Sequence, residues 1–117
     1  MGLQYDISSS STCGILLLEG RIISDEGLSE IIEGVEKNIA EGKNTWLCDL
    51  SKLSYCNSTG LNLFIRILTK SRNAGGDCVL INLQPGVRQL FELSKLNEIF
   101  TSYASLQEAL DRYNTIA

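Results

Sequence analysis

Three consecutive polar residues, Asn57, Ser58 and Thr59, offer the most distinctive chemistry in this sequence. They stand where an extended segment gives way to an amphipathic stretch. Their oxygens can therefore accept hydrogen bonds from the free N–H groups of a helix's first turn. The same N–H groups and the helix dipole also suit an anion. Capping by Asn57 or Ser58 explains one or two of these side chains and leaves the remainder open to another role.

Gly60 adds a second unusual feature to this segment. A glycine inside the first turn of a helix lowers helix stability by roughly 1 kcal/mol relative to alanine. A small residue at that position permits the close approach of a partner or of another part of the backbone, which capping alone does not require. The segment is therefore a candidate for contact as well as for helix initiation.

Other kinds of site are excluded or disfavoured by composition. The chain has no histidine, which excludes Ser-His and Cys-His nucleophile pairs, histidine–zinc sites and phosphohistidine relays. Neither GxxxxGK(S/T), GxGxxG nor GxSxG occurs. The four cysteines are separated by 35, 8 and 22 residues, so no CxxC pair exists, and we expect reduced core thiols: Cys13, Cys48, Cys56 and Cys78. We therefore expect neither an enzyme nor a metal or cofactor site.

Length and charge indicate one acidic domain spanning residues 1–117. Ten basic and 14 acidic residues give a net charge of −4, which disfavours nucleic-acid binding. The charge is uneven: residues 1–49 carry −6 and residues 50–117 carry +2. The amino terminus lacks a basic segment followed by an apolar stretch, and no apolar run approaches about 18 residues. We therefore expect a cytoplasmic protein without membrane insertion.

The positions of apolar residues predict alternating strands and helices. Strands are expected at 3–7, 13–19, 45–50, 78–83 and 99–100, with a brief extended piece at 53–56. Helices are expected at 24–41, with Ser24 as N-cap, at 58–74, from Pro85, and from Ser105. The short connection between the first two strands favours an antiparallel pair, and the later strands form parallel crossover units. The predicted fold is α/β, a mixed five-stranded sheet with about four helices.

The chain also carries a recognisable succession of motifs. D-L-S begins at Asp49, N-S-T-G-L spans 57–61, G-G ends the following helical stretch, and CVLINLQPGVRQLFELSKL spans 78–96. This succession resembles the STAS domain family, which includes the bacterial anti-sigma factor antagonists and domains of sulfate transporters. The resemblance is ordered from Asp49 to Phe100 and looser over nearly all of the remaining chain. It implies a fold similar to the one predicted from the residue pattern.

The resemblance implies a regulatory function. In the antagonists, the anti-sigma factor is a serine kinase that phosphorylates the serine at the position of Ser58 here. Unphosphorylated antagonist binds the anti-sigma factor, the phosphorylated form does not, and a phosphatase resets the switch. Thr59 is a second acceptor. Many antagonists have aspartate where this chain has Asn57, so a constitutive STAS subunit of a larger complex, such as a transporter-associated assembly, is the alternative.

The same resemblance places the partner surface around Ser58. Asn62 and Arg66 follow it at intervals of four and would share one helix face, although a plain solvated face explains them as well. The residues assigned to partner binding are Asn57, Thr59, Gly60, Asn62 and Arg66. The connections at 21–24 and 84–86 are further candidates for this end of the sheet. A third hypothesis is a nucleotide or small anion bound at the helix start. The sequence is compatible with a dimer.

Overall fold

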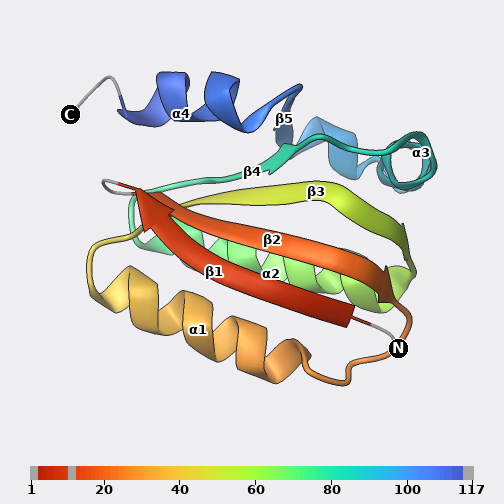
Figure 1. Cartoon of the computed structure of the whole chain (residues 1–117), viewed down its shortest axis with the longest axis horizontal. Coiled ribbons are helices and arrows are strands. Elements are labelled where there is room, and N and C mark those ends of the chain that lie inside the picture. Colours follow the sequence, from red (N-terminus) through yellow and green to blue (C-terminus); the bar gives the residue numbers. More distant parts are fainter. Residues whose placement is uncertain (1–2, 11–12, 115–117) are drawn as a thin grey trace.

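A computed structural model describes residues 3–10 and 13–114, and over these residues the chain forms a five-stranded sheet with four α-helices and one 3₁₀ turn (Figure 1). The elements in chain order are β1 (Leu3–Ser10), β2 (Cys13–Ile22), α1 (Leu28–Ala40), β3 (Thr45–Cys56), α2 (Ser58–Asn73), β4 (Cys78–Ile81), α3 (Pro85–Leu93), η1 (Leu96–Glu98), β5 (Thr101–Tyr103) and α4 (Leu106–Asn114).

The strands lie in the order β1-β2-β3-β4-β5. β1 pairs antiparallel with β2, and every later neighbouring pair is parallel. Helices that return the chain to the same end of the sheet make parallel pairing possible, whereas the short β1–β2 connection allows only an antiparallel pair. The mixed sheet predicted from the sequence is confirmed.

The two faces of the sheet are covered unequally. The larger core lies beneath β2, β3 and β4 and is closed by α1, α2 and α3, with Trp46, Phe64 and Phe91 buried in it. The smaller core lies on the other face, where α4 packs Ala109 against Leu47 and Val79. Figure 1 shows α4 apart from α1 and α2, beside β4 and β5. Helices α1, α2 and α3 therefore cover most of the buried apolar side chains.

Several predicted boundaries are wrong. Ser24 is not the N-cap of α1, because the helix begins at Leu28 after Gly27, whose φ of 81° is in the left-handed region. The Ser24 hydroxyl instead accepts a hydrogen bond from the Glu26 N–H, at 3.3 Å. The predicted pieces at 45–50 and 53–56 form one strand, β3. The edge strand lies at Thr101–Tyr103 rather than 99–100, since Phe100 is buried in the larger core.

All four cysteines are free and buried, as expected for core thiols. The Sγ atoms of Cys48 and Cys78 lie 3.7 Å apart on adjacent strands. Within residues 3–10 and 13–114, no helix has the length and apolar character needed to cross a membrane. The same residues contain no group of three or more His, Cys, Asp or Glu side chains placed to hold a metal ion.

Candidate functional site

The site lies where β2 and β3 extend beyond the rest of the sheet. β4 pairs with β3 only from Trp46 to Asp49, whereas β2 stays paired with β3 as far as Cys56. Two register shifts, at Leu17/Glu19 and Gly20/Arg21, occur along this two-stranded extension. β3 ends at Cys56, and α2 begins two residues later. The start of α2 is therefore presented at a projecting end of the sheet.

Asn57 is the N-cap of α2. Its Oδ1 accepts hydrogen bonds from the N–H groups of Thr59, at 3.0 Å, and Gly60, at 3.4 Å. Its Nδ2 donates to the carbonyl of Ile23 at 3.1 Å, and its backbone N–H donates to the carbonyl of Ile22 at 3.1 Å. One side chain therefore caps the helix and also ties it to the β2–α1 connection.

Ser58 is left free of this capping role. It is the first residue of α2, its side chain is exposed, and no hydrogen bond to its hydroxyl is formed within the described part of the chain. The first turn of α2 contains no acidic residue. An exposed hydroxyl therefore stands at the positive end of a 16-residue helix with no negative side chain nearby in the turn.

Gly60 is explained by internal packing. A Cβ added at this position would lie 2.7 Å from the Cβ of Cys56 and 3.2 Å from the side chain of Ile22. Gly60 is buried, so the expectation that it contacts a partner directly gives way to a positioning role. Its missing side chain allows α2 to begin directly against the ends of β2 and β3.

The remaining predicted contact residues lie together on α2. Asn62 and Arg66 are exposed and Thr59 is half-buried. All three line a groove of about 600 Å³ between α2 and the start of α1, where Asp25 and Leu28 form the other side. Arg66 belongs to neither ion pair found within residues 3–10 and 13–114. Its guanidinium is available for an external acceptor.

Two exposed apolar residues lie at this end of the sheet: Ile23 belongs to the candidate segment at 21–24, whereas Tyr55 was not predicted as a contact. Ile23 is 50% exposed and Tyr55 is 49% exposed. Arg21 is the pairing partner of Tyr55 in the register, and Ile23 follows the last residue of β2, which pairs with Cys56. Exposed aromatic and apolar groups of this size are typical anchors of protein interfaces. The sequence contained both residues, but their exposure depends on the register.

The two candidate connections have different positions. The segment at 21–24 adjoins the Ser58 end through the bond between Asn57 and Ile23. The turn at 84–86 follows the carboxyl end of β4 and so lies at the same end of the sheet, but it is set back from Ser58, because the Gln84 Nε2 donates to the carbonyl of Ser51, at 2.6 Å, in the middle part of β3. The turn therefore supports the side of the extension rather than its tip.

Cys56 lies directly beneath the site but is poorly suited to react. Its side chain is fully buried, and burial raises the pKa of the thiol from 9.0 to about 11. The thiolate is the nucleophilic form of cysteine, so this thiol is largely unreactive at neutral pH.

These features define a small α/β domain that presents a capped helix start and an exposed hydroxyl for recognition. The chain belongs to the STAS domain family, whose sequence model matches residues 6–109. That match confirms the resemblance carried by the N-S-T-G-L segment and the motifs that follow it.

Particular relatives agree with the family assignment. The chain is 27% identical over 101 residues to the "Putative anti-sigma factor antagonist BtrV" of Bordetella bronchiseptica, with 86% of each chain covered. Its fold is similar to that of the unphosphorylated anti-sigma factor antagonist SpoIIAA, with a TM-score of 0.82, 22% identity, and coverage of 97% of this chain and 99% of that one. The phosphorylated SpoIIAA of Bacillus gives a TM-score of 0.74 at 21% identity, covering 93% and 98%.

Proposed function

We propose that this protein is an anti-sigma factor antagonist that binds a serine-kinase anti-sigma factor and is released when the kinase phosphorylates Ser58. The observation that carries the proposal is that the cap of α2 and the exposed hydroxyl beside it belong to two different residues. Asn57 supplies the cap, so the Ser58 hydroxyl is exposed and unpartnered among the described residues. The relative from Bordetella, named as an antagonist, supports the same function.

A phosphate at this position is compatible with the folded domain. Phosphoserine carries about −1.5 to −2 charges near neutral pH. The dipole of α2 stabilises a negative charge at its first turn by about 0.3–1 kcal/mol. No acidic side chain in that turn opposes the charge. Phosphorylation therefore acts on the partner interface. It adds bulk and charge to a surface that loses its water when the partner binds.

The proposed contact surface combines the α2 residues with two apolar anchors. Asn57, Thr59, Asn62 and Arg66 supply polar groups beside Ser58, while Ile23 and Tyr55 supply about half-exposed apolar side chains. Gly60 acts indirectly by seating α2 on Cys56. A phosphatase would restore the binding form. Because the kinase reaction consumes ATP, the proposed partnership operates in the cytoplasm.

Asn57 favours a second candidate, a constitutive STAS subunit of a larger assembly. Its Nδ2 donates to the Ile23 carbonyl, a bond that the aspartate of many antagonists cannot donate. A neutral side chain also removes a negative charge beside Ser58. If the kinase requires that charge to recognise its substrate, Ser58 is not phosphorylated and the domain stays bound to its partner.

Phosphopeptide mass spectrometry on the protein isolated from its own cells distinguishes these candidates. We expect a single phosphate on Ser58, removed by phosphatase treatment. Affinity capture with unmodified protein should retain an anti-sigma factor kinase, whereas a Ser58→Asp variant should lose it. Ser105→Asp is the matched control, because Ser105 lies at the start of α4 on the opposite face of the sheet.

The possible results of these experiments distinguish the switch from the constitutive subunit. A peptide that stays unmodified under all growth conditions, together with unchanged capture by Ser58→Asp, would refute the switch and support the constitutive subunit. Equal loss of capture in Ser58→Asp and Ser105→Asp would show that added charge anywhere disrupts the domain. Calorimetric titration with ATP or GTP tests the anion-binding hypothesis, and we expect no heat of binding.

A further inference from the structure

β1 presents an open edge of the sheet. It is the terminal strand and pairs only with β2, through eight consecutive residue pairs without a register shift. None of its eight residues is fully buried. Natural proteins usually protect such an edge with charged side chains, above all lysine, with proline or with a bulge; β1 carries one charged residue, Asp6, and no lysine, proline or bulge. The backbone groups on its outer side form a template for an added strand.

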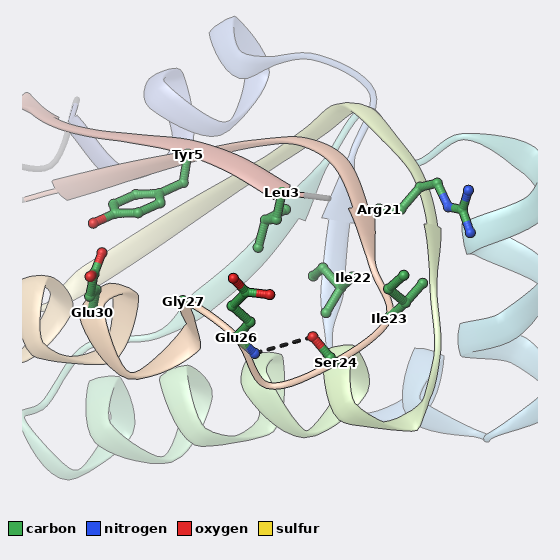
Figure 2. A pocket seen from close by; sticks show the side chains of 9 residues that line it. All are labelled: Leu3, Tyr5, Arg21, Ile22, Ile23, Ser24, Glu26, Gly27 and Glu30. Carbon is green, nitrogen blue, oxygen red and sulfur yellow. Dashed lines mark hydrogen bonds between the residues drawn. The ribbon is translucent and has the colours of Figure 1, made fainter. Parts of the chain in front are cut away.

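A groove of about 650 Å³ runs beneath this edge, between β1 and the start of α1 (Figure 2). Leu3 and Ile23 supply apolar surface, and Tyr5 is 41% exposed. Figure 2 shows the carboxylates of Glu26 and Glu30 directed toward the groove, with Glu30 below the Tyr5 hydroxyl. The Arg21 side chain, which also borders the groove, points away from it in this view. The groove therefore combines apolar and negative surface.

The opposite side of the edge is similar in character. A hollow of about 180 Å³ there is lined by Gln4, Tyr5, Asp6, Leu17 and Glu19. Asp6 and Glu19, like the two glutamates of the groove, take part in neither ion pair formed within the described residues. A strand added to β1 would point alternate side chains to these two sides. Each side offers it carboxylates and an apolar surface.

We propose that β1 is the docking edge for an extended, basic segment of a partner protein, bound by strand addition. Main-chain hydrogen bonds to β1 supply affinity. Alternate lysine or arginine side chains, which share one face of the added strand, meet the unpaired carboxylates of Glu26 and Glu30, and the other face packs against Tyr5 and Leu17. Charge selects this occupant over a second copy of the chain. An antiparallel β1–β1 pair would bring together two edges that each carry four unpaired carboxylates.

The probe is a seven-residue peptide of alternating lysine and valine with blocked ends, added to the full chain. Nuclear magnetic resonance should show shifts in residues 3–9 and in Glu26 and Glu30, with new exchange protection of alternate β1 amides. Added salt should weaken the binding. A Glu26→Gln/Glu30→Gln double variant should weaken it roughly fivefold, since two exposed charge pairs are removed. Ser102→Asp, an exposed position on the opposite edge strand β5, should leave it unchanged.

Two N-methylated peptides provide the decisive control. Methylation of one alternate set of amides leaves the other set free to donate to β1, so that peptide should still bind, whereas methylation of both sets should abolish binding. Binding by the fully methylated peptide equal to that of the unmethylated one would overturn strand addition and leave charge attraction alone. Absence of binding at millimolar peptide would also overturn the proposal. A dimer that the peptide dissociates would identify a second copy as the occupant and refute the basic partner.

Discussion

At the scale of single residues, Asn57 determines which side chains at the start of α2 are not needed for capping. The sequence left capping open between Asn57 and Ser58, and the structure assigns it to Asn57. The amide side chain bonds two N–H groups of α2 and one carbonyl of the β2–α1 connection. Ser58 can therefore be modified without removing the cap, so recognition and helix initiation belong to different side chains.

Substitution of Asn57 should reveal both of its roles. Asn57→Ala removes the cap and the bond to Ile23, and we expect a loss of about 1–2 kcal/mol in the free energy of unfolding. Asn57→Asp keeps the acceptor and adds a charge favoured by the dipole, but loses the donor to Ile23. It should stay within about 1 kcal/mol of the wild type. Urea denaturation measures both values.

Asn62→Ala is the matched control for this pair. Asn62 is exposed on α2 and should change stability by no more than about 0.5 kcal/mol. A loss for Asn57→Asp as large as that for Asn57→Ala would assign the stabilising effect to the Nδ2–Ile23 bond rather than to the cap.

The raised pKa of the Cys56 thiol predicts that the folded protein loses stability at high pH. Burial raises its pKa to about 11 in the folded protein, while the unfolded thiol titrates near 9.0. Between these values the unfolded state releases a proton that the folded state retains, so the free energy of unfolding falls as pH rises. Burial likewise raises the pKa of Tyr113, which extends the fall above its ordinary value of 10.0.

The measurement is the urea midpoint of wild type and Cys56→Ala across about pH 8 to 11. The variant lacks the thiol, so its midpoint should decline less steeply even though its absolute stability is lower. Parallel slopes for the two proteins would contradict the assignment of this titration to Cys56.

At the scale of elements, the contact of α2 with the sheet depends on Gly60. Gly60→Ala would raise helix propensity by roughly 1 kcal/mol, but its methyl group would lie 2.7 Å from the Cβ of Cys56. Overpacking typically costs about 1–3 kcal/mol, so we expect a net loss of stability. Gly86→Ala is the control, because Gly86 lies in α3 with open space around it. We expect a gain of roughly 0.5 kcal/mol there.

Thermal and urea unfolding of both glycine variants test this contrast. A stabilised Gly60→Ala would mean that α2 shifts freely on the ends of β2 and β3. The start of α2 would then not be held as closely as the structure indicates. We also expect Gly60→Ala to weaken capture of the partner proposed for the Ser58 surface. The added methyl group would displace the start of α2 and so move Ser58 relative to Ile23 and Tyr55.

Most elements were predictable because their patterns are local. The apolar stripe of residues 28–39 and the helix after Asn57 follow from spacing within one turn or two. The errors arose where tertiary packing overrides local signals. Ser24 resembles an N-cap, yet the chain must first turn away from β2 through Gly27. Ile99 and Phe100 have strand-like side chains, but the η1 turn directs Phe100 into the core.

The candidate site was predicted in part for the same reason. Ser58, Asn62 and Arg66 share a face because helical spacing alone determines it. Ile23 and Tyr55 come from two different strands, and their proximity to Ser58 depends on the pairing of β2 with β3 and on two register shifts. A single sequence contains no local record of that register. The segment at 21–24 was a candidate from the sequence, but the exposure of Ile23 and the position of Tyr55 required the structure.

At the scale of the whole molecule, the sheet separates two cores of unequal size. Among the residues that the structure describes, the larger contains 22 buried residues, including Cys48, Cys56 and Cys78, and the smaller contains five, including Cys13. The smaller core is closed by α4, a helix of nine residues. A short helix over few buried side chains opens at a lower free energy than the rest of a domain.

Thiol labelling tests whether the two cores open separately. All four thiols are buried, so alkylation requires an opening of the structure. If α4 detaches locally, Cys13 reacts first and its rate depends weakly on denaturant, since little surface is exposed. Cys48 and Cys78 lie on the central strands β3 and β4, with their side chains in the larger core, and should react only with global unfolding. Mass spectrometry of iodoacetamide-labelled peptides would measure each rate, and one shared rate and denaturant dependence for all thiols would instead make the domain a single cooperative unit.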